Sequence, residues 1–270
     1  MDILWEPWQL AFMQRALVAV LLVAGLCGVA GSLLVVRRQA LLGDAIAHSL
    51  LPGAALAFVV NLPLSVGAFV AGLLAAFCMA VVPQRSPVKE DAAMGIVFSA
   101  FFAAGVALIT VIQKERKIDL SHFLFGNLLA TTPQDLVEMA IATAVVIGAI
   151  ALFYKEILFY SFDPEGAAVA GLPVRALEVG ITVGITAAVT VGMKAVGVLL
   201  VLAMSIAPGA TAYLWMPRLR GVMVAAALLA ALSGVVGLYG SYFLNLPSGP
   251  AIVLVSAGLF GIAWGTHRRS

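Results

Sequence analysis

Charged residues are scarce in this chain. They make up 10% of its 270 residues, whereas 63% of the residues are hydrophobic, and the mean hydropathy is +1.11. Average soluble proteins carry roughly a quarter charged residues, so this composition excludes a soluble globular protein and indicates a polytopic membrane protein. The formal net charge is only +2, and no nucleic-acid partner is expected.

Cysteine and the common catalytic motifs are also rare or absent. Cys27 and Cys78 are the only cysteines, and because neither has CxxC or CxH spacing, both are interpreted as small buried hydrophobic residues. None of the five lysines follows a glycine, so the chain has no GxxxxGK[ST] phosphate-binding loop. HExxH and GxSxG are missing as well. These absences remove the obvious zinc-protease and serine-hydrolase interpretations, and any pumping must draw energy from a partner or from an ion gradient.

Long apolar runs dominate the rest of the chain. At roughly 20 residues per span, they predict an all-α transmembrane bundle of about eight or nine spans, in a single domain over residues 1–270. Residues 113–132 are ambiguous, and so is the stretch 177–215, where only Gly192, Met193 and Lys194 separate two runs. The nine candidates are 16–36, 45–61, 64–83, 92–112, 133–153, 177–193, 195–215, 221–243 and 249–265.

Basic residues in the short connections predict the orientation, because they are enriched on the cytoplasmic side. Alternating spans put ten Lys or Arg residues on the side of Arg37 and Arg38, and five on the other side. This count favours an N-terminus outside and a C-terminus in the cytoplasm. The basic cluster at 113–119 lies on the outer side and runs against the rule.

Two ionisable residues interrupt the apolar segment LLGDAIAHSLLPG at 41–53. Asp44 and His48 are four residues apart, so on a helix they lie on one face. Ionisable groups at membrane depth usually face a cavity, a partner or a substrate path, and an Asp oxygen with a His nitrogen suits divalent Mn, Zn or Fe. The alternative is structural: an interfacial or helix-capping Asp44 near the arginines, and a hydrogen-bonded packing histidine.

Pro52-Gly53 and Pro208-Gly209 lie within apolar segments. A proline removes an intrahelical hydrogen bond, and the glycine eases a bend. Kinks of this kind suit a transport path, although an ordinary packing kink is equally compatible. Closely spaced glycines in several spans, such as Gly28 and Gly31, predict tight helix packing.

The longest inner connection, 154–176, contains its own helix signals. Asp163-Pro164-Glu165 is typical of a helix start, and Gly171 followed by Leu172-Pro173 predicts its end. A helix of about two turns is therefore expected near 160–172. Its alanine-rich surface offers little apolar bulk to anchor it on a membrane. We therefore favour a helix that docks into a partner protein over one that only lies on the membrane surface.

Four stretches in this order resemble one family, the membrane permeases of ABC importers for zinc, manganese and iron. The resemblance covers essentially the whole chain and rests on RRQALLGDAIAHSLLPG (37–53), DLSHFLFGNLLATTPQD (119–135), YKEILFYSFDPEGAAVAGL (154–172) and KAVGVLLVLAMSIAPGATAYL (194–214). It implies a homodimer in a bacterial plasma (inner) membrane, with two cytoplasmic ATPase subunits and an extracytoplasmic metal-binding protein. No cofactor is bound permanently, and the cargo is a divalent metal.

The resemblance also assigns roles to residues. Asp44 and His48 would line the translocation path, and a homodimer would double these two ligands to four. Asp163, Glu165 and Gly171 would contact the ATPase as a coupling helix. Glu90 and Asp91 correspond to an acidic position of the family at the cytoplasmic mouth of the path. For at least one of them, the alternative is a solvated surface carboxylate with no such role. His122 is a candidate for an outer gate, or alternatively a structural residue of a loop.

The metal and the energy source remain open between alternatives. The segments SHFLFGN and SFDPE are similar to those of the manganese/iron branch of the family, so manganese is favoured over zinc or iron. A gradient-driven metal/proton transporter, with Asp44 as its protonation site, is the main competing function. It would be expected to show an inverted repeat, and none is convincing; an intramembrane enzyme or scaffold lacks a visible catalytic cluster.

Overall fold

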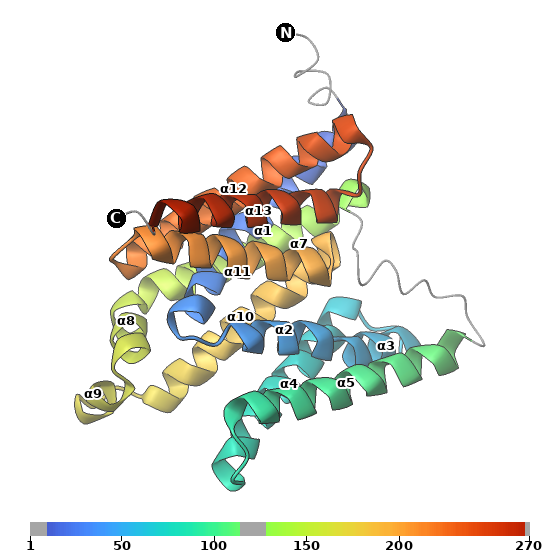
Figure 1. The fold of residues 1–270 in the computed structure, drawn as a ribbon. Coiled ribbons are helices and arrows are strands. Elements are labelled where there is room, and N and C mark those ends of the chain that lie inside the picture. The colour runs from blue at the N-terminus through green and yellow to red at the C-terminus, as the bar shows by residue number, and fades with distance from the viewer. Residues whose placement is uncertain (1–9, 114–127, 268–270) are drawn as a thin grey trace.

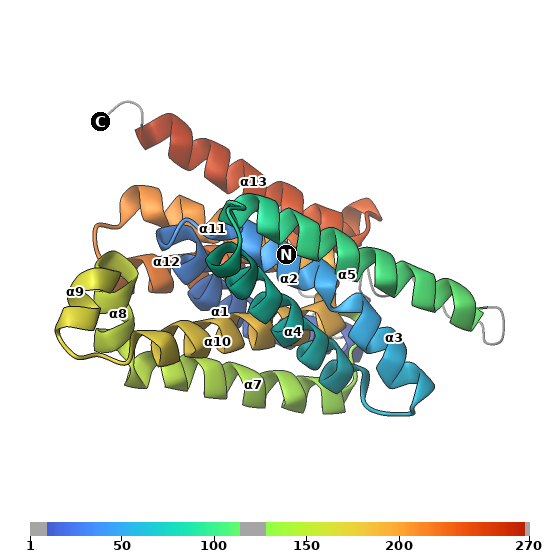
Figure 2. The same ribbon diagram turned by 90° about the horizontal axis from the view of Figure 1, so that it is seen from below.

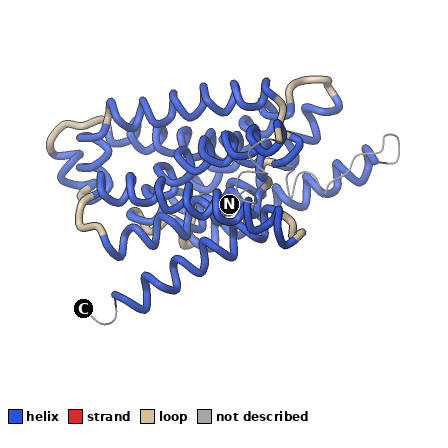
Figure 3. The backbone as a smooth tube through the Cα atoms, turned by 90° about the horizontal axis from the view of Figure 1, so that it is seen from above, coloured by secondary structure: helices blue, strands red, loops and turns tan. Residues whose placement is uncertain are grey.

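The chain was analysed as a computed structural model, which describes residues 10–113 and 128–267. Regular structure in these residues is helical throughout (Figure 3), which confirms the predicted all-α class. The helices are α1 (Ala11–Val36), α2 (Ala40–Ser49), α3 (Leu51–Val59), α4 (Leu64–Arg85), α5 (Glu90–Gln113), the short 3-10 helix η3 (Leu128–Ala130), α7 (Pro133–Leu152), α8 (Tyr154–Phe162), α9 (Pro164–Val169), α10 (Val174–Val196), α11 (Val198–Trp215), α12 (Leu219–Leu244) and α13 (Ser248–His267).

Eight helical segments in the described part of the chain are long and apolar enough to span a membrane. They are α1, the continuous pair α2–α3, α4, α5, α7, α10, α12 and α13. The ninth apolar helix, α11, is shorter (Leu200–Trp215 within it), but it also runs along the bundle (Figure 1). The count of eight or nine is thus confirmed, and the start of α1 and the end of α13 lie at opposite ends of the bundle (Figure 1).

The boundary between α10 and α11 differs from the expectation. The sequence suggested a break at 192–194, but α10 continues to Val196 and only Gly197 separates the two helices. Gly197 has φ 81° and ψ 164°, a conformation that is essentially restricted to glycine. The turn therefore occurs at the residue that can adopt it, and Lys194 stays inside the last turn of α10.

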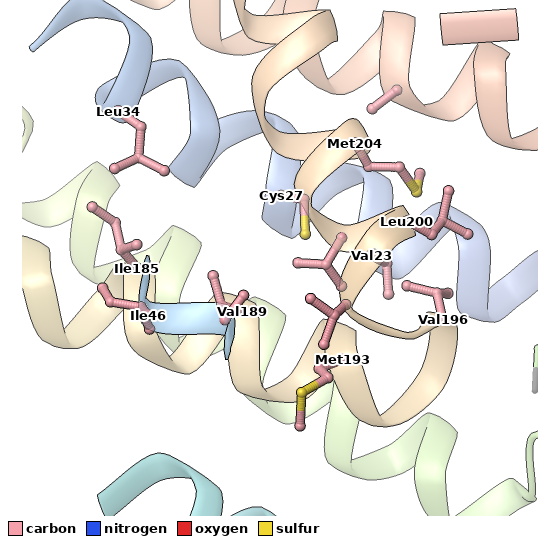
Figure 4. Packing of buried hydrophobic residues seen from close by; sticks show 14 of the residues in the cluster. Val23, Cys27, Leu34, Ile46, Ile185, Val189, Met193, Val196, Leu200 and Met204 are labelled. Atoms are coloured by element: carbon pink, nitrogen blue, oxygen red, sulfur yellow. The ribbon is translucent and has the colours of Figure 1, made fainter. Parts of the chain in front are cut away.

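Helix α1 lies at the centre of the bundle, and its glycines allow close packing. A Cβ atom on Gly28 would lie 2.6 Å from the Cα of Ala227 on α12, and one on Gly31 would meet the backbone of Ser205 on α11. Cys27 of α1 is fully buried beside α10 and α11 (Figure 4). Cys78 is a free, half-buried thiol. Tight glycine packing is thus confirmed at Gly28 and Gly31, and the buried apolar interpretation is confirmed for Cys27 but not for the half-buried Cys78.

Helices α8 and α9 form a separate feature at one end of the bundle, here called the α9 end (Figures 1 and 2). Helix α9 begins where predicted, because the Asp163 side chain caps it by accepting a hydrogen bond from the Gly166 N–H at 2.8 Å. It ends before Gly171, which has φ +80°. The sequence did not predict that residues 154–162 form a helix of their own.

Candidate functional site

A proline divides the span that carries the Asp–His pair. Helix α2 ends at Ser49 and α3 begins at Leu51, with Pro52 in the first turn of α3. Because proline has no backbone N–H and its ring crowds the carbonyl four residues earlier, the carbonyl of His48 has no i+4 donor. The break thus leaves a free backbone acceptor on the same residue that carries the imidazole.

The two ionisable side chains meet on one face of α2, as the spacing predicted. Nε2 of His48 lies 3.5 Å from Oδ1 of Asp44. The Asp44 side chain is 45% exposed and that of His48 is 26% exposed. Asp44 is not a helix cap, because Gln39 precedes the first residue of α2, so the capping alternative is wrong.

Two aromatic rings from α5 enclose the imidazole. The ring centroids of Phe98 and Phe102 lie 5.4 Å and 5.6 Å from that of His48, both in edge-on contact. The Nδ1 atom of His48 is buried and makes no hydrogen bond. A buried nitrogen without a partner is unfavourable, and the imidazole is thus held in place by ring packing and by Asp44 alone.

The Asp44–His48 pair of a single chain is too small to complete a metal coordination shell. Among the described residues, no three His, Cys, Asp or Glu side chains lie close enough to hold a metal ion together. An Asp–His pair provides two ligands, whereas Mn²⁺ and Zn²⁺ take four to six. The half-exposed Asp44 is accessible to ligands from outside this chain.

A second polar feature opens at the α9 end. It is a cleft of about 260 Å³ between α2, α4, α5 and α10. Glu90 lines this cleft, as does Glu178, which sequence analysis had not selected as a candidate site residue. Arg37, Gln39 and Gln84 add further polar groups to the lining.

Asp91, the neighbour of Glu90, is not among the residues that line the cleft. It is exposed in the first turn of α5. The two carboxylates of this pair are therefore in different surroundings, and Glu90 is the one that faces a concave surface.

The α9 segment presents a mostly exposed surface. Ala167 is fully buried and fixes the helix to the bundle, whereas Val169 on the same helix is 90% exposed. The carboxylate of Glu165 and the turn at Gly171 are exposed as well. An exposed apolar side chain with a neighbouring charge, on a firmly packed short helix, is suited to contact with another protein.

At the opposite end of the bundle, Lys194 joins two helices. Its Nζ lies 2.8 Å from Oδ1 of Asp135 and 2.7 Å from Oε2 of Glu138, so the end of α10 is tied to the start of α7. Reasoning from sequence missed this cluster, because Lys194 is 56 residues from Glu138 and still farther from Asp135. His122, the candidate outer gate, lies outside the described residues.

Comparisons with known proteins cover nearly the whole chain. The sequence model of the ABC 3 transport family matches residues 9–266. A manganese transport system membrane protein, MntC, from Listeria monocytogenes is 42% identical over 256 residues, which are 95% of this chain and 91% of that protein. A probable iron transport system membrane protein from Haemophilus influenzae is 38% identical over 262 residues, covering 97% and 96% of the two chains.

A solved structure is similar in fold as well as in sequence. The structure titled PsaBC from Streptococcus pneumoniae in complex with Fab superposes with a TM-score of 0.89 at 35% identity, over 97% of this chain and 94% of that one.

Proposed function

Because the chain belongs to the ABC 3 transport family, we propose that it is the permease subunit of an ATP-binding-cassette importer that carries manganese to the cytoplasm. Permeases of metal transport systems for manganese or iron are its relatives. The observation that carries the proposal is the Asp44–His48 pair on one face of a broken, membrane-spanning helix. Ionisable residues at that depth mark transport paths more often than packing sites.

The metal path is proposed to lie between two copies of the chain. Each copy supplies an Asp oxygen and a His nitrogen, and Asp44 is half-exposed at the surface of a single chain. Two copies around a twofold axis provide four ligands, which is enough for a transition metal.

ATP hydrolysis is assigned to separate cytoplasmic subunits that dock on α9. The exposed Val169 and Glu165 would contact the ATPase, while Asp163 caps the helix and Gly171 allows the following turn. The α9 end also carries Arg37 beside α8, Lys155 within α8 and Arg175 at the start of α10. By the positive-inside rule, this end faces the cytoplasm, and the start of α1 lies outside, where a metal-binding protein would deliver the ion.

Manganese is favoured over iron and zinc on the relatives' names and on chemistry. A carboxylate with an imidazole accepts all three ions, and affinity alone would favour zinc over manganese. Selectivity would then come from geometry and from the delivering protein. The exit of the ion is assigned to the cleft lined by Glu90 and Glu178.

The test is uptake of radiolabelled manganese, iron and zinc in cells that lack their own importers. The chain is expressed alone, with its ATPase, and with both the ATPase and the binding protein. We expect manganese uptake only when all three are present. Uptake by the chain alone, sensitive to an ionophore and resistant to ATP depletion, would reject the importer and favour the gradient-driven transporter.

A further inference from the structure

One polar contact crosses from the α8–α9 segment to the turn that precedes α2. The guanidinium of Arg37 donates a hydrogen bond from Nη2 to the Tyr160 hydroxyl at 3.2 Å, across 123 residues of sequence. The same guanidinium carbon lies 4.8 Å from the centroid of the tyrosine ring. Tyr160 is 6% exposed, so the contact is protected from solvent on the tyrosine side.

The arginine lies at a sharply defined turn. Arg37 ends α1, and Arg38 adopts φ 58°, a left-handed conformation that is uncommon for any residue except glycine. Gln39 N–H bonds back to the Leu34 carbonyl at 2.8 Å, and Arg38 N–H bonds to the Val35 carbonyl at 3.0 Å. These bonds fix the geometry of the turn, so a displacement of Arg37 is passed on to α2, which begins at residue 40.

The tyrosine is equally well connected on its side. Tyr160 belongs to the same buried cluster as Ala167 of α9, and Asp163 links α8 to α9 through its helix cap. Burial raises the pKa of the Tyr160 phenol, while the charge of Arg37 opposes this rise. The phenol therefore remains neutral, and its oxygen is available as an acceptor.

We propose that Arg37 is a positioning residue whose contact with Tyr160 transmits movement of the α8–α9 segment to the helix that carries Asp44 and His48. This inference rests on the proposed docking of an ATPase at α9. In the part of the chain that the structure describes, no other polar side-chain contact joins α8 or α9 to the α1–α2 turn. Arg37 also lines the polar cleft that contains Glu178, so this one side chain contacts both α8 and the lining of the cleft.

The fold contains a matched control for this contact. Arg220 of α12 lies over the ring of Tyr154 on α8, with its guanidinium carbon 4.4 Å from the ring centroid. This pair also anchors α8 to the bundle, but to a helix that carries neither Asp44 nor His48. A contact that merely holds α8 in place should behave like the control pair, whereas a coupling contact should not.

The experiment measures metal transported per ATP hydrolysed by the full complex in proteoliposomes. It compares wild type with Arg37→Lys, Tyr160→Phe and their double variant, and, for the control pair, with Arg220→Lys, Tyr154→Leu, which removes the ring beneath the guanidinium, and their double variant. Arg37→Lys keeps the charge, and Tyr160→Phe keeps the ring but removes the hydroxyl. Because a hydrogen bond to a charged group changes an equilibrium roughly tenfold or more, we expect the transport ratio to fall about tenfold in each Arg37 or Tyr160 variant. ATP hydrolysis and ATPase co-purification should be retained.

The double variant should lose no more than either single one, because the two residues act through one contact. The control variants should keep the wild-type ratio. An unchanged ratio in the Arg37 and Tyr160 variants, an equal loss in both pairs, or loss of the bound ATPase would each overturn the inference. Failure of the proposed function is distinguishable, because the wild-type complex would then show no ATP-dependent uptake at all.

Discussion

The crossing of α3 and α4 offers a sharp test of how the span that carries Asp44 and His48 is held. Gly53 and Gly67 face each other there, and a Cβ atom on either glycine would meet the carbonyl oxygen of the other. A Cβ on Gly53 would also lie 2.5 Å from the Cβ of Ala71, about 1 Å short of an ordinary carbon–carbon contact. In Gly53→Ala the two helices must therefore separate.

The magnitude follows from the cost of overpacking a tight interface, which is about 1–3 kcal/mol. For a chain of this size, each kcal/mol lowers the melting temperature by roughly 2–4 °C. Gly53→Ala should therefore melt about 2–12 °C below wild type. Gly148→Ala is the matched control, because nothing lies within 4 Å of its Cβ position on α7, and alanine should stabilise that helix by about 0.5–1 kcal/mol.

The assay is thermal unfolding in detergent, followed with a thiol-reactive fluorescent dye. Cys27 is fully buried in the folded chain and becomes reactive on unfolding, while the partly buried Cys78 sets the baseline. A Gly53→Ala variant that melts at or above the temperature of Gly148→Ala would refute the close crossing of α3 and α4.

Three further substitutions test separate parts of the account. Pro52→Ala restores an N–H that can bond the His48 carbonyl, and it should straighten the span. Manganese uptake should then fall at least about tenfold at an unchanged protein level. Normal uptake would contradict a role for the break. Gly171→Val forces a β-branched residue into φ +80°, so metal-stimulated ATP hydrolysis should be lost, whereas Gly171→Asn, which tolerates this conformation, should retain it; equal activity of the two variants would remove the turn from coupling. Lys194→Gln removes two partly exposed ion pairs and should lower the free energy of unfolding by about 1 kcal/mol or less. Its melting temperature should no longer fall when salt is added. A salt dependence equal to that of wild type would contradict the bridge.

Local patterns were sufficient to predict part of this architecture. Helix α9 was predictable because its start, Asp163-Pro164, and its end, at Gly171, lie within nine residues of each other. The shared face of Asp44 and His48 followed from helical spacing alone. The apolar runs gave the spans because the bilayer imposes their length.

Other features depended on contacts that no local pattern contains. Arg37 and Tyr160 are 123 residues apart in sequence, and neither belongs to a motif that would single it out. The break at Gly197 could not be distinguished from one at Gly192 by hydropathy, because packing decides which glycine adopts the unusual conformation. Glu178 was not selected from the sequence, because only the fold brings α4 and α5 beside it to form the cleft.

The most direct test of the account is the binding of manganese to the purified protein, which we propose is a dimer. Equilibrium dialysis with radiolabelled manganese should detect one ion per two chains in the wild type, and less than about a tenth of that in Asp44→Asn and His48→Ala, with all three eluting as the same dimer. Asp44→Asn is the cleaner variant, because the half-exposed Asp44 side chain contributes little to packing. Unchanged manganese binding in both variants would contradict the assignment of the metal path to Asp44 and His48.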